Sequence, residues 1–146
     1  MKYPIGIQDF EKIIEDGYVY VDKTDLVYKL ANEGHVYFLS RPRRFGKSLL
    51  ISTLKYYFQG RKDLFKGLAI DKLEKEWAVY PVFHISFGTA NFTKPGTLDD
   101  VIDKYLSDAE NDYQIKTKVK DYGLRFKDIL KAAHKKAGRR AVVLID

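Results

Sequence analysis

The stretch SRPRRFGKSLL, residues 40–50, decides how the rest of this chain is interpreted. It ends in Gly46-Lys47-Ser48, as a phosphate-binding loop does, but it has Arg41 where such a loop begins with glycine. In such a loop, backbone N–H groups surround a phosphate at the positive N-terminus of a helix. Gly46 would let the backbone approach the phosphate, Lys47 would reach the β- and γ-oxygens, and the Ser48 hydroxyl would ligate Mg²⁺.

The sequence on both sides of the loop has the pattern that this chemistry needs. HVYFLS, residues 35–40, is a nearly continuous apolar run, which is typical of a strand buried on both faces of a parallel sheet. From Lys47 to Phe58 the apolar residues recur at helical spacing, and Gly60 would end that helix. We therefore expect the order strand, loop, helix.

Pro42 explains how the loop can have Arg41 in place of its first glycine. The residue before a proline is pushed toward an extended backbone, so Arg41 needs no positive φ. The turn is then expected between Pro42 and Phe45, which makes the loop a variant rather than a broken one. Arg43 and Arg44 would add positive charge near the phosphates and could contact them, whereas an arginine that faces solvent or pairs with an acid is the alternative.

Strands and helices are expected to alternate along the whole chain. The other predicted strands are YVYVD (18–22), YPVFHISF (80–87) and AVVLID (141–146), and the other predicted helices cover 25–33, 98–113 and 124–137. Asp22 or Thr24 would cap the first of these helices, while Gly34 and Gly138 would end the first and the last in a left-handed conformation. This alternation predicts an α/β fold with a parallel sheet.

The last predicted strand ends in an acid, Asp146. In phosphate-loop folds an aspartate at the end of a neighbouring strand holds the Mg²⁺ shell, and we assign this role to Asp146. The predicted catalytic residues are Lys47 and Asp146, and the predicted metal site combines Ser48 with Asp146. The predicted nucleotide-binding residues are Arg43, Arg44, Phe45, Gly46, Lys47, Ser48 and Leu49. The alternative is a basic strand-to-helix turn and an unrelated acid on a core strand.

Composition sets wider limits on the function. The 146 residues can form one ordinary core, and the formal charge of +6 favours phosphate-bearing partners only mildly. The absence of cysteine excludes disulfides, thiolate metal sites and a cysteine nucleophile. No stretch resembles a secretion signal or approaches the length of a membrane span. We therefore expect a cytoplasmic protein without a membrane partner.

Two further groups of residues are candidate sites. His35, His84 and His134 have no metal-ligand spacing, so we interpret them as structural. Lysines recur at 127, 131 and 135, and a basic stripe of this kind could bind nucleic acid. A solvated face of an amphipathic helix explains the same pattern.

Four segments resemble a known family. YPIGIQDFEKIIEDGYVYVDKTDLVYKL, YFLSRPRRFGKSLLISTLKYYF, LFKGLAI and the final VVLID closely resemble the AAA-ATPase-like family of bacterial proteins. RPRRFGKS looks like that family's form of the Walker A loop, and it is also similar to the Gly-Pro-Arg-Arg-x-Gly-Lys-Thr loop of archaeal ATPases. The resemblance implies a three-layer α/β/α P-loop NTPase fold of the AAA-like type. Residues 1–34 would be its N-terminal segment, and residues 35–146 its P-loop core through the Walker B strand.

The resemblance also implies a function and the position of this sequence within a longer domain. It implies binding of ATP or ADP with Mg²⁺, and a sheet of order 5-1-4-3-2 in which the loop strand pairs with strands that follow the Walker B strand. Relatives continue with a glutamate that activates water, and they often carry a PD-(D/E)xK nuclease-like domain. Because the sequence stops at Asp146, we expect the N-terminal part of such a domain, with hydrolysis only in the full-length protein. The alternatives are a nucleotide-binding module without hydrolysis and a basic nucleic-acid-binding domain, and a homo-oligomer stays open.

Overall fold

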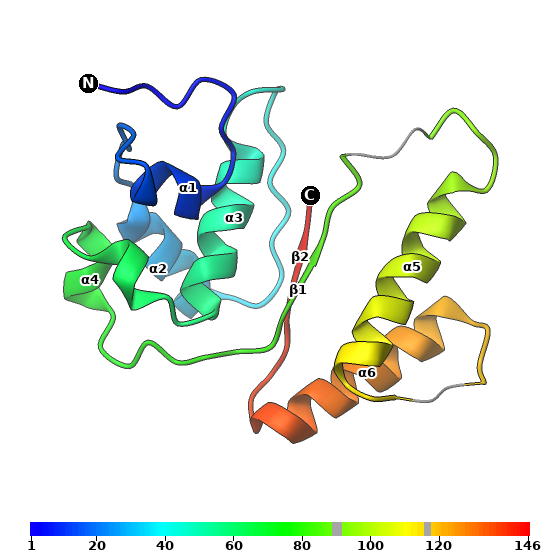
Figure 1. Cartoon of the computed structure of the whole chain (residues 1–146). Coiled ribbons are helices and arrows are strands. Elements are labelled where there is room, and N and C mark those ends of the chain that lie inside the picture. The colour runs from blue at the N-terminus through cyan, green and yellow to red at the C-terminus, as the bar shows by residue number, and fades with distance from the viewer. Residues whose placement is uncertain (89–91, 116–117) are drawn as a thin grey trace. The chain divides into compact units, whose positions relative to one another are not determined.

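The computed structural model describes residues 1–88, 92–115 and 118–146, and it divides the chain into two compact units. Met1–Val79 form the first unit and Tyr80–Asp146 form the second. The first contains α1 (Phe10–Glu15), α2 (Thr24–Glu33), α3 (Lys47–Phe58), the 3-10 helix η1 (Lys62–Phe65) and α4 (Ala69–Leu73) (Figure 1). The second contains β1 (Val82–Ile85), α5 (Thr97–Asp112), α6 (Tyr122–Ala137) and β2 (Val142–Ile145).

The first unit is built around a cluster of aromatic rings. Phe10 and Phe65 are fully buried, with ring centroids 4.8 Å apart. Tyr57 of α3 meets Phe65 edge-on at 6.4 Å, and Trp77 lies 5.3 Å from the same ring. Burial of a phenylalanine side chain contributes about 1.5–3 kcal/mol, so this cluster supplies much of the stability of the unit. It also anchors α3, the helix that begins at the candidate loop.

Hydrogen bonds fix α3 to α1 as well. The Ser52 hydroxyl accepts the Phe10 backbone N–H at 2.9 Å, and it lies 3.3 Å from the Asp9 carboxylate. The Tyr56 hydroxyl donates to the same carboxylate at 3.1 Å. Asp9 in turn caps α1 by accepting the Lys12 N–H at 3.0 Å. The start of α1 and the middle of α3 therefore share one polar network.

In the second unit, two parallel strands are covered on one face by two helices. β1 and β2 pair in the register Val82↔Val142 to Ile85↔Ile145. Helices α5 and α6 pack on this sheet through a buried cluster that consists of Phe83, Leu106, Ala109, Ile129 and Ala133. The strand and both helices therefore share one small core.

A buried arginine joins α5 to α6. Arg125 is 7% exposed and donates to both carboxylate oxygens of Glu110, at 2.8 and 2.9 Å. Its guanidinium also donates to the Ser107 hydroxyl at 3.1 Å and to the Asp103 carboxylate. Hydrogen bonding to Glu110, and next to Asp103, raises the pKa of Arg125. The guanidinium of Arg125 therefore stays protonated, and its loss would leave Glu110 buried without a cation.

The predicted three-layer α/β/α P-loop fold is wrong for this structure. In the described part of the chain, helices predominate and the only sheet has two strands, β1 and β2. These strands confirm the predicted strands at 80–87 and 141–146, and they are parallel as predicted. A two-stranded sheet is too narrow to form the middle layer of the predicted fold.

Two predicted strands do not form, and for one of them the described part of the chain shows no neighbouring strand that its backbone could pair with. Residues 18–22 and 35–40 have no strand conformation, and Val36 and Phe38 are 92% and 93% exposed. An apolar run becomes a strand only if a neighbouring strand accepts its N–H groups and donates to its carbonyls. In the described residues, the 35–40 segment has no such neighbour.

The predicted helices are all confirmed, with small shifts at their ends. They correspond to α2, α3, α5 and α6. Gly60 and Gly138 are left-handed, with φ of 69° and 65°, as expected for residues that end helices. Gly34 is not left-handed, because its φ of −164° lies in the extended region. The helix at 24–33 therefore runs directly into extended chain.

Asp22 connects the start of α2 to the start of α4. Its Oδ1 accepts the N–H and the hydroxyl of Thr24 at 2.9 and 2.7 Å, and its Oδ2 accepts the Ala69 N–H at 2.7 Å. The Thr24 hydroxyl accepts the Ile70 N–H at 3.0 Å. Burial alone would raise the pKa of Asp22, but the hydrogen bonds from Thr24 and Ala69 lower it below its usual value.

We expect Asp22→Ala to lower the free energy of unfolding by about 1–3 kcal/mol, because it removes the acceptor of two backbone N–H groups. Since the folded-state pKa is lowered, this stabilisation is present above the unfolded pKa of about 4 and is lost as the pH falls through the folded value. Urea unfolding at neutral pH and at pH 3 measures both effects. Asp25→Ala, in the first turn of α2, is the control and should cost less than about 1 kcal/mol. Equal losses for the two variants would contradict this role of Asp22.

Candidate functional site

The candidate loop is an exposed turn that leads directly into α3. Residues 41–46 are exposed, the turn is at Arg43 and Arg44, and Gly46 is the N-cap of the helix. Arg44 and Gly46 are left-handed, with φ of 65° and 75°, whereas Arg41 has no positive φ. The turn therefore lies where the sequence predicted it, and arginine in the usual glycine position causes no backbone strain.

The backbone N–H groups of the loop have no acceptor among the described residues. From Arg43 to Leu49, none of them donates to a backbone or side-chain acceptor in the described part of the chain. The next N–H group, that of Leu50, bonds the Gly46 carbonyl at 3.0 Å. Left-handed residues that alternate with others, as Arg44 and Gly46 do around Phe45, are the backbone pattern of anion-binding concavities. The loop thus presents a continuous run of donors at the positive end of a helix.

The Lys47 ammonium lies across the beginning of the loop. It donates to the carbonyl oxygens of Arg41 at 2.6 Å and of Pro42 at 3.3 Å. These bonds connect the end of the loop to its beginning through the Lys47 side chain. They place a positive charge beside the first two carbonyls of the loop. The same ammonium could reach an anion that is held by the loop, because lysine has three donors and a flexible stem.

The remaining predicted nucleotide-binding residues lie in the same turn or in the first turn of α3. Arg43 and Arg44 are exposed and make no hydrogen bond or ion pair with any described residue. The Ser48 hydroxyl is likewise without a protein partner among these residues, so it is available to a ligand. Phe45 is 62% exposed, and the Leu49 carbonyl accepts the Thr53 hydroxyl at 2.8 Å. The seven residues thus form one continuous stretch, and their contact with phosphates stays a prediction.

Asp146 belongs to the other unit. It follows β2 and continues the ladder, because its N–H donates to the Ile85 carbonyl at 2.9 Å and its carbonyl accepts the Phe87 N–H at 3.0 Å. The acid therefore stands at the carboxyl end of a parallel strand, as predicted. Its pairing with Ser48 around Mg²⁺ joins residues of different units and stays a prediction.

Two negative findings apply to the described residues. In residues 1–88, 92–115 and 118–146, no group of three or more histidine or acidic side chains could hold a metal ion by itself. The three histidines therefore form no metal site there. No helix in these ranges is both long and apolar enough to span a membrane.

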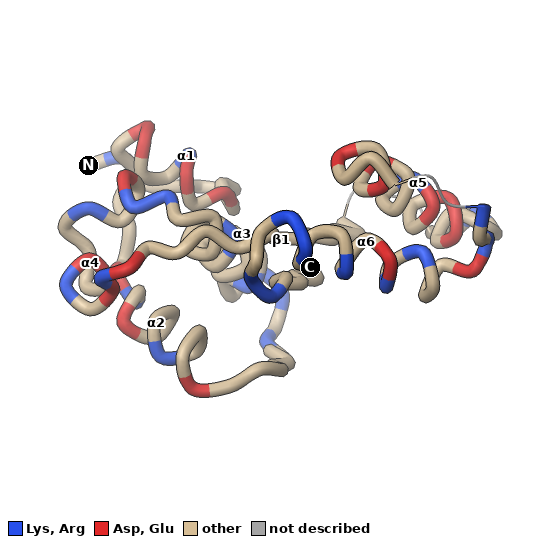
Figure 2. The backbone as a smooth tube through the Cα atoms, turned by 90° about the horizontal axis from the view of Figure 1, so that it is seen from below, with Lys and Arg blue, Asp and Glu red and all other residues tan. Residues whose placement is uncertain are grey.

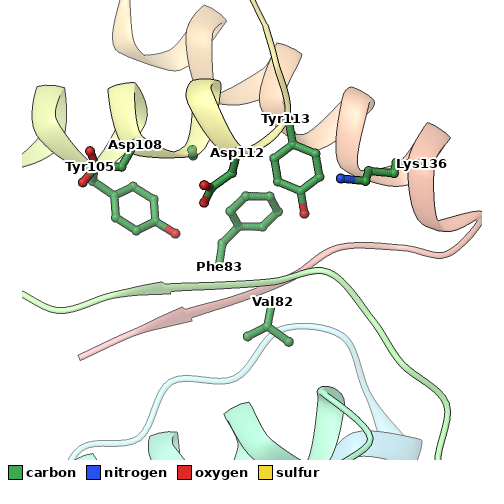
Figure 3. Close-up of a pocket in the computed structure, with 8 residues that line it drawn as sticks. Val82, Phe83, Tyr105, Asp108, Asp112, Tyr113 and Lys136 are labelled. Carbon is green, nitrogen blue, oxygen red and sulfur yellow. The ribbon is translucent and has the colours of Figure 1, made fainter.

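The second unit contains a pocket that the sequence analysis missed. It has a volume of about 360 Å³ and is lined by Val82, Phe83, Tyr105, Asp108, Ala109, Asp112, Tyr113 and Lys136 (Figure 3). Burial, and next the neighbouring Tyr113, raises the pKa of Tyr105 to about 12. The Lys136 ammonium lies 5.4 Å from the centre of the Tyr113 ring. The helical spacing of the four lining positions 105, 108, 109 and 112 on α5 was a signal for a shared face.

Comparison with known proteins agrees with the resemblance seen in the sequence. A family model described as a predicted AAA-ATPase matches residues 4–146. An uncharacterized protein in the vnfD 5′ region of Azotobacter chroococcum mcd 1 is 42% identical over 147 residues, which cover 99% of this chain. The chain spans only 28% of the length of that relative. No solved structure matches the chain.

Proposed function

The chain belongs to the AAA-ATPase-like family, and from this premise we propose that its loop from Arg43 to Leu49 binds the phosphates of ATP or ADP together with Mg²⁺. The observation that carries the proposal is the run of backbone N–H groups that find no acceptor in the described part of the chain. These groups begin a helix of 12 residues, where the helix dipole favours an anion. A phosphate can accept several such N–H groups at once, which a single water molecule cannot.

Each side chain of the site has a proposed role. Lys47 moves from the carbonyls of Arg41 and Pro42 to the β- and γ-phosphate oxygens. The Ser48 hydroxyl would be a ligand of Mg²⁺, and the carboxylate of Asp146, which follows β2, would be available to the shell of a metal ion. When bound, Mg²⁺ neutralises part of the phosphate charge.

Hydrolysis needs an additional group that orients or deprotonates the attacking water. We assign nucleotide binding to the loop and propose that turnover occurs only in the full-length protein. Resemblance to the AAA-ATPase-like family implies that the water-activating residue is a glutamate that follows the Walker B aspartate. Phosphate release by the chain and by a version extended beyond Asp146 tests this division, and equal rapid rates would contradict it.

Calorimetric titration with Mg-ATP and Mg-ADP tests the binding proposal. We expect one site per chain, and we expect chelation of Mg²⁺ to weaken the binding of both nucleotides. Ser48→Ala should reduce the dependence on Mg²⁺, because it removes the proposed hydroxyl ligand. If neither nucleotide binds, the loop is a basic turn without this function.

Arg44 offers a test of what its side chain contributes. The exposed Arg44 side chain has no partner among the described residues and so does not stabilise the fold. Its backbone nevertheless has a left-handed conformation, which glycine adopts more easily. We expect Arg44→Ala and Arg44→Gly to weaken Mg-ATP binding equally, by about fivefold, because both remove one charge worth about 1 kcal/mol. Lys66→Ala, which removes an exposed charge from the first unit but not from the loop, is the control for calorimetry. If only the alanine variant weakens binding, the backbone and not the guanidinium matters.

A further inference from the structure

One exposed face of α6 carries three lysines. Lys127, Lys131 and Lys135 are all exposed and recur every four residues, so they follow one side of the helix. The opposite side carries Ile129 and Ala133, which are fully buried in the core of the second unit. The lysines therefore point to solvent because the fold of this unit requires it.

The protein hardly neutralises this charge. In the described part of the chain, Lys127 and Lys135 take part in no ion pair and no hydrogen bond. Lys131 lies 3.8 Å from Asp128, but these side chains are 67% and 49% exposed, and such a pair contributes at most about 1 kcal/mol. The lysine face, which we define as Lys127, Lys131 and Lys135, is thus a free cationic surface.

Helix stability does not explain the pattern. Like charges four residues apart destabilise a helix by about 0.2–0.5 kcal/mol for each pair. A cation in the last turn is favoured by the helix dipole, and this accounts for Lys135. It does not account for Lys127 and Lys131, which lie before the last turn. A polyanion that neutralises all three lysines would remove the repulsion.

The spacing and surroundings of the lysine face fit a chain of phosphates. Four residues of helix rise by about 6 Å, so the three lysines extend over about 12 Å, a length in which a nucleic acid presents several phosphates. Arg139 and Arg140 are exposed just beyond the end of α6. Figure 2 shows lysine and arginine along α6 and past it, whereas acids predominate on α5. Of the two helices of this unit, α6 thus carries most of the positive charge.

We propose that the lysine face of α6 binds the phosphate backbone of nucleic acid without reading its sequence. Lysine ammoniums are point charges suited to phosphates, and phosphate contacts carry affinity without sequence information. This function does not depend on the nucleotide loop, because the lysine face and the loop belong to different units.

The test is binding of a short fluorescein-labelled DNA duplex, and of one of its single strands, followed by fluorescence anisotropy at several salt concentrations. The variant combines Lys127→Gln, Lys131→Gln and Lys135→Gln, since glutamine keeps the helix propensity of lysine. We expect its affinity to fall about tenfold or more at low salt. The slope of log affinity against log salt should become shallower for each lysine removed, by about 0.9 with the duplex and by about 0.7 with the single strand.

A second triple variant, Lys62→Gln with Lys66→Gln and Lys72→Gln, changes the net charge equally but alters exposed lysines of the first unit. We expect it to bind both DNAs nearly as the parent does. An equal loss in the two triple variants would show that only net charge matters and would overturn the proposal. An unchanged affinity and salt slope in the α6 variant, or a parent chain that binds neither DNA at low salt, would overturn it as well.

Discussion

Replacing Lys47 with alanine is expected to reduce the affinity for Mg-ATP and Mg-ADP by about 100-fold or more. The variant loses the ammonium proposed to reach the β- and γ-phosphates, and a hydrogen bond to a charged group contributes about 1.5–3 kcal/mol. It also loses the two bonds that close the loop onto the carbonyls of Arg41 and Pro42. Calorimetry measures the affinity, and far-UV circular dichroism shows whether the variant remains folded.

Lys47→Gln separates the two effects of the substitution. Glutamine keeps N–H donors for the carbonyls of Arg41 and Pro42 but carries no charge. If the charge matters, glutamine should fail to bind nucleotide almost as completely as alanine. Lys55→Ala, on the same helix but eight positions later, should bind like the parent chain. Normal binding by Lys47→Ala would remove the loop from the nucleotide site altogether.

Local patterns in the sequence predicted most of the elements and the shape of the loop. The spacing of apolar residues and the glycines at 60 and 138 predicted α3 and α6, because helices depend on contacts between near neighbours in sequence. Pro42 predicted that Arg41 needs no left-handed backbone, which is confirmed. Local rules did not predict that Arg44 is left-handed, since that conformation is uncommon for any residue except glycine.

Features that depend on distant partners were predicted poorly. HVYFLS was predicted as a buried strand from its composition, but its side chains at 36 and 38 are exposed because no described strand pairs with it. Whether an apolar run is a strand depends on what lies beside it, and its own residues do not contain that information. The same limit applies to Asp146. Its place at the end of a strand was predicted correctly, but local sequence cannot determine whether its carboxylate lies near the Ser48 hydroxyl.

Arg125 shows the same limit in a helix. Arginine is almost always exposed, so the residue type at position 125 gives no signal of burial. Arg125 is instead buried, because Glu110 of α5 offers a carboxylate that is itself buried. A charge is buried when it meets a partner, and that partner is 15 residues away in sequence.

Arg125→Met is therefore expected to destabilise the second unit by about 3–5 kcal/mol, because it leaves Glu110 buried without a cation. Hydrogen exchange of the backbone amides in α5 and α6 measures this loss directly within the unit. Lys127→Met lies two positions later on the exposed face and should change stability by less than about 0.5 kcal/mol.

A second substitution tests whether the orphaned acid is the cause. Adding Glu110→Met to Arg125→Met removes the buried charge and replaces the ion pair with apolar side chains, which in other buried pairs is neutral or stabilising. We expect the double variant to recover most of the lost protection in α5 and α6. If it is no more stable than Arg125→Met alone, the arginine stabilises the unit by packing its stem between the helices, and the ion pair with Glu110 is secondary.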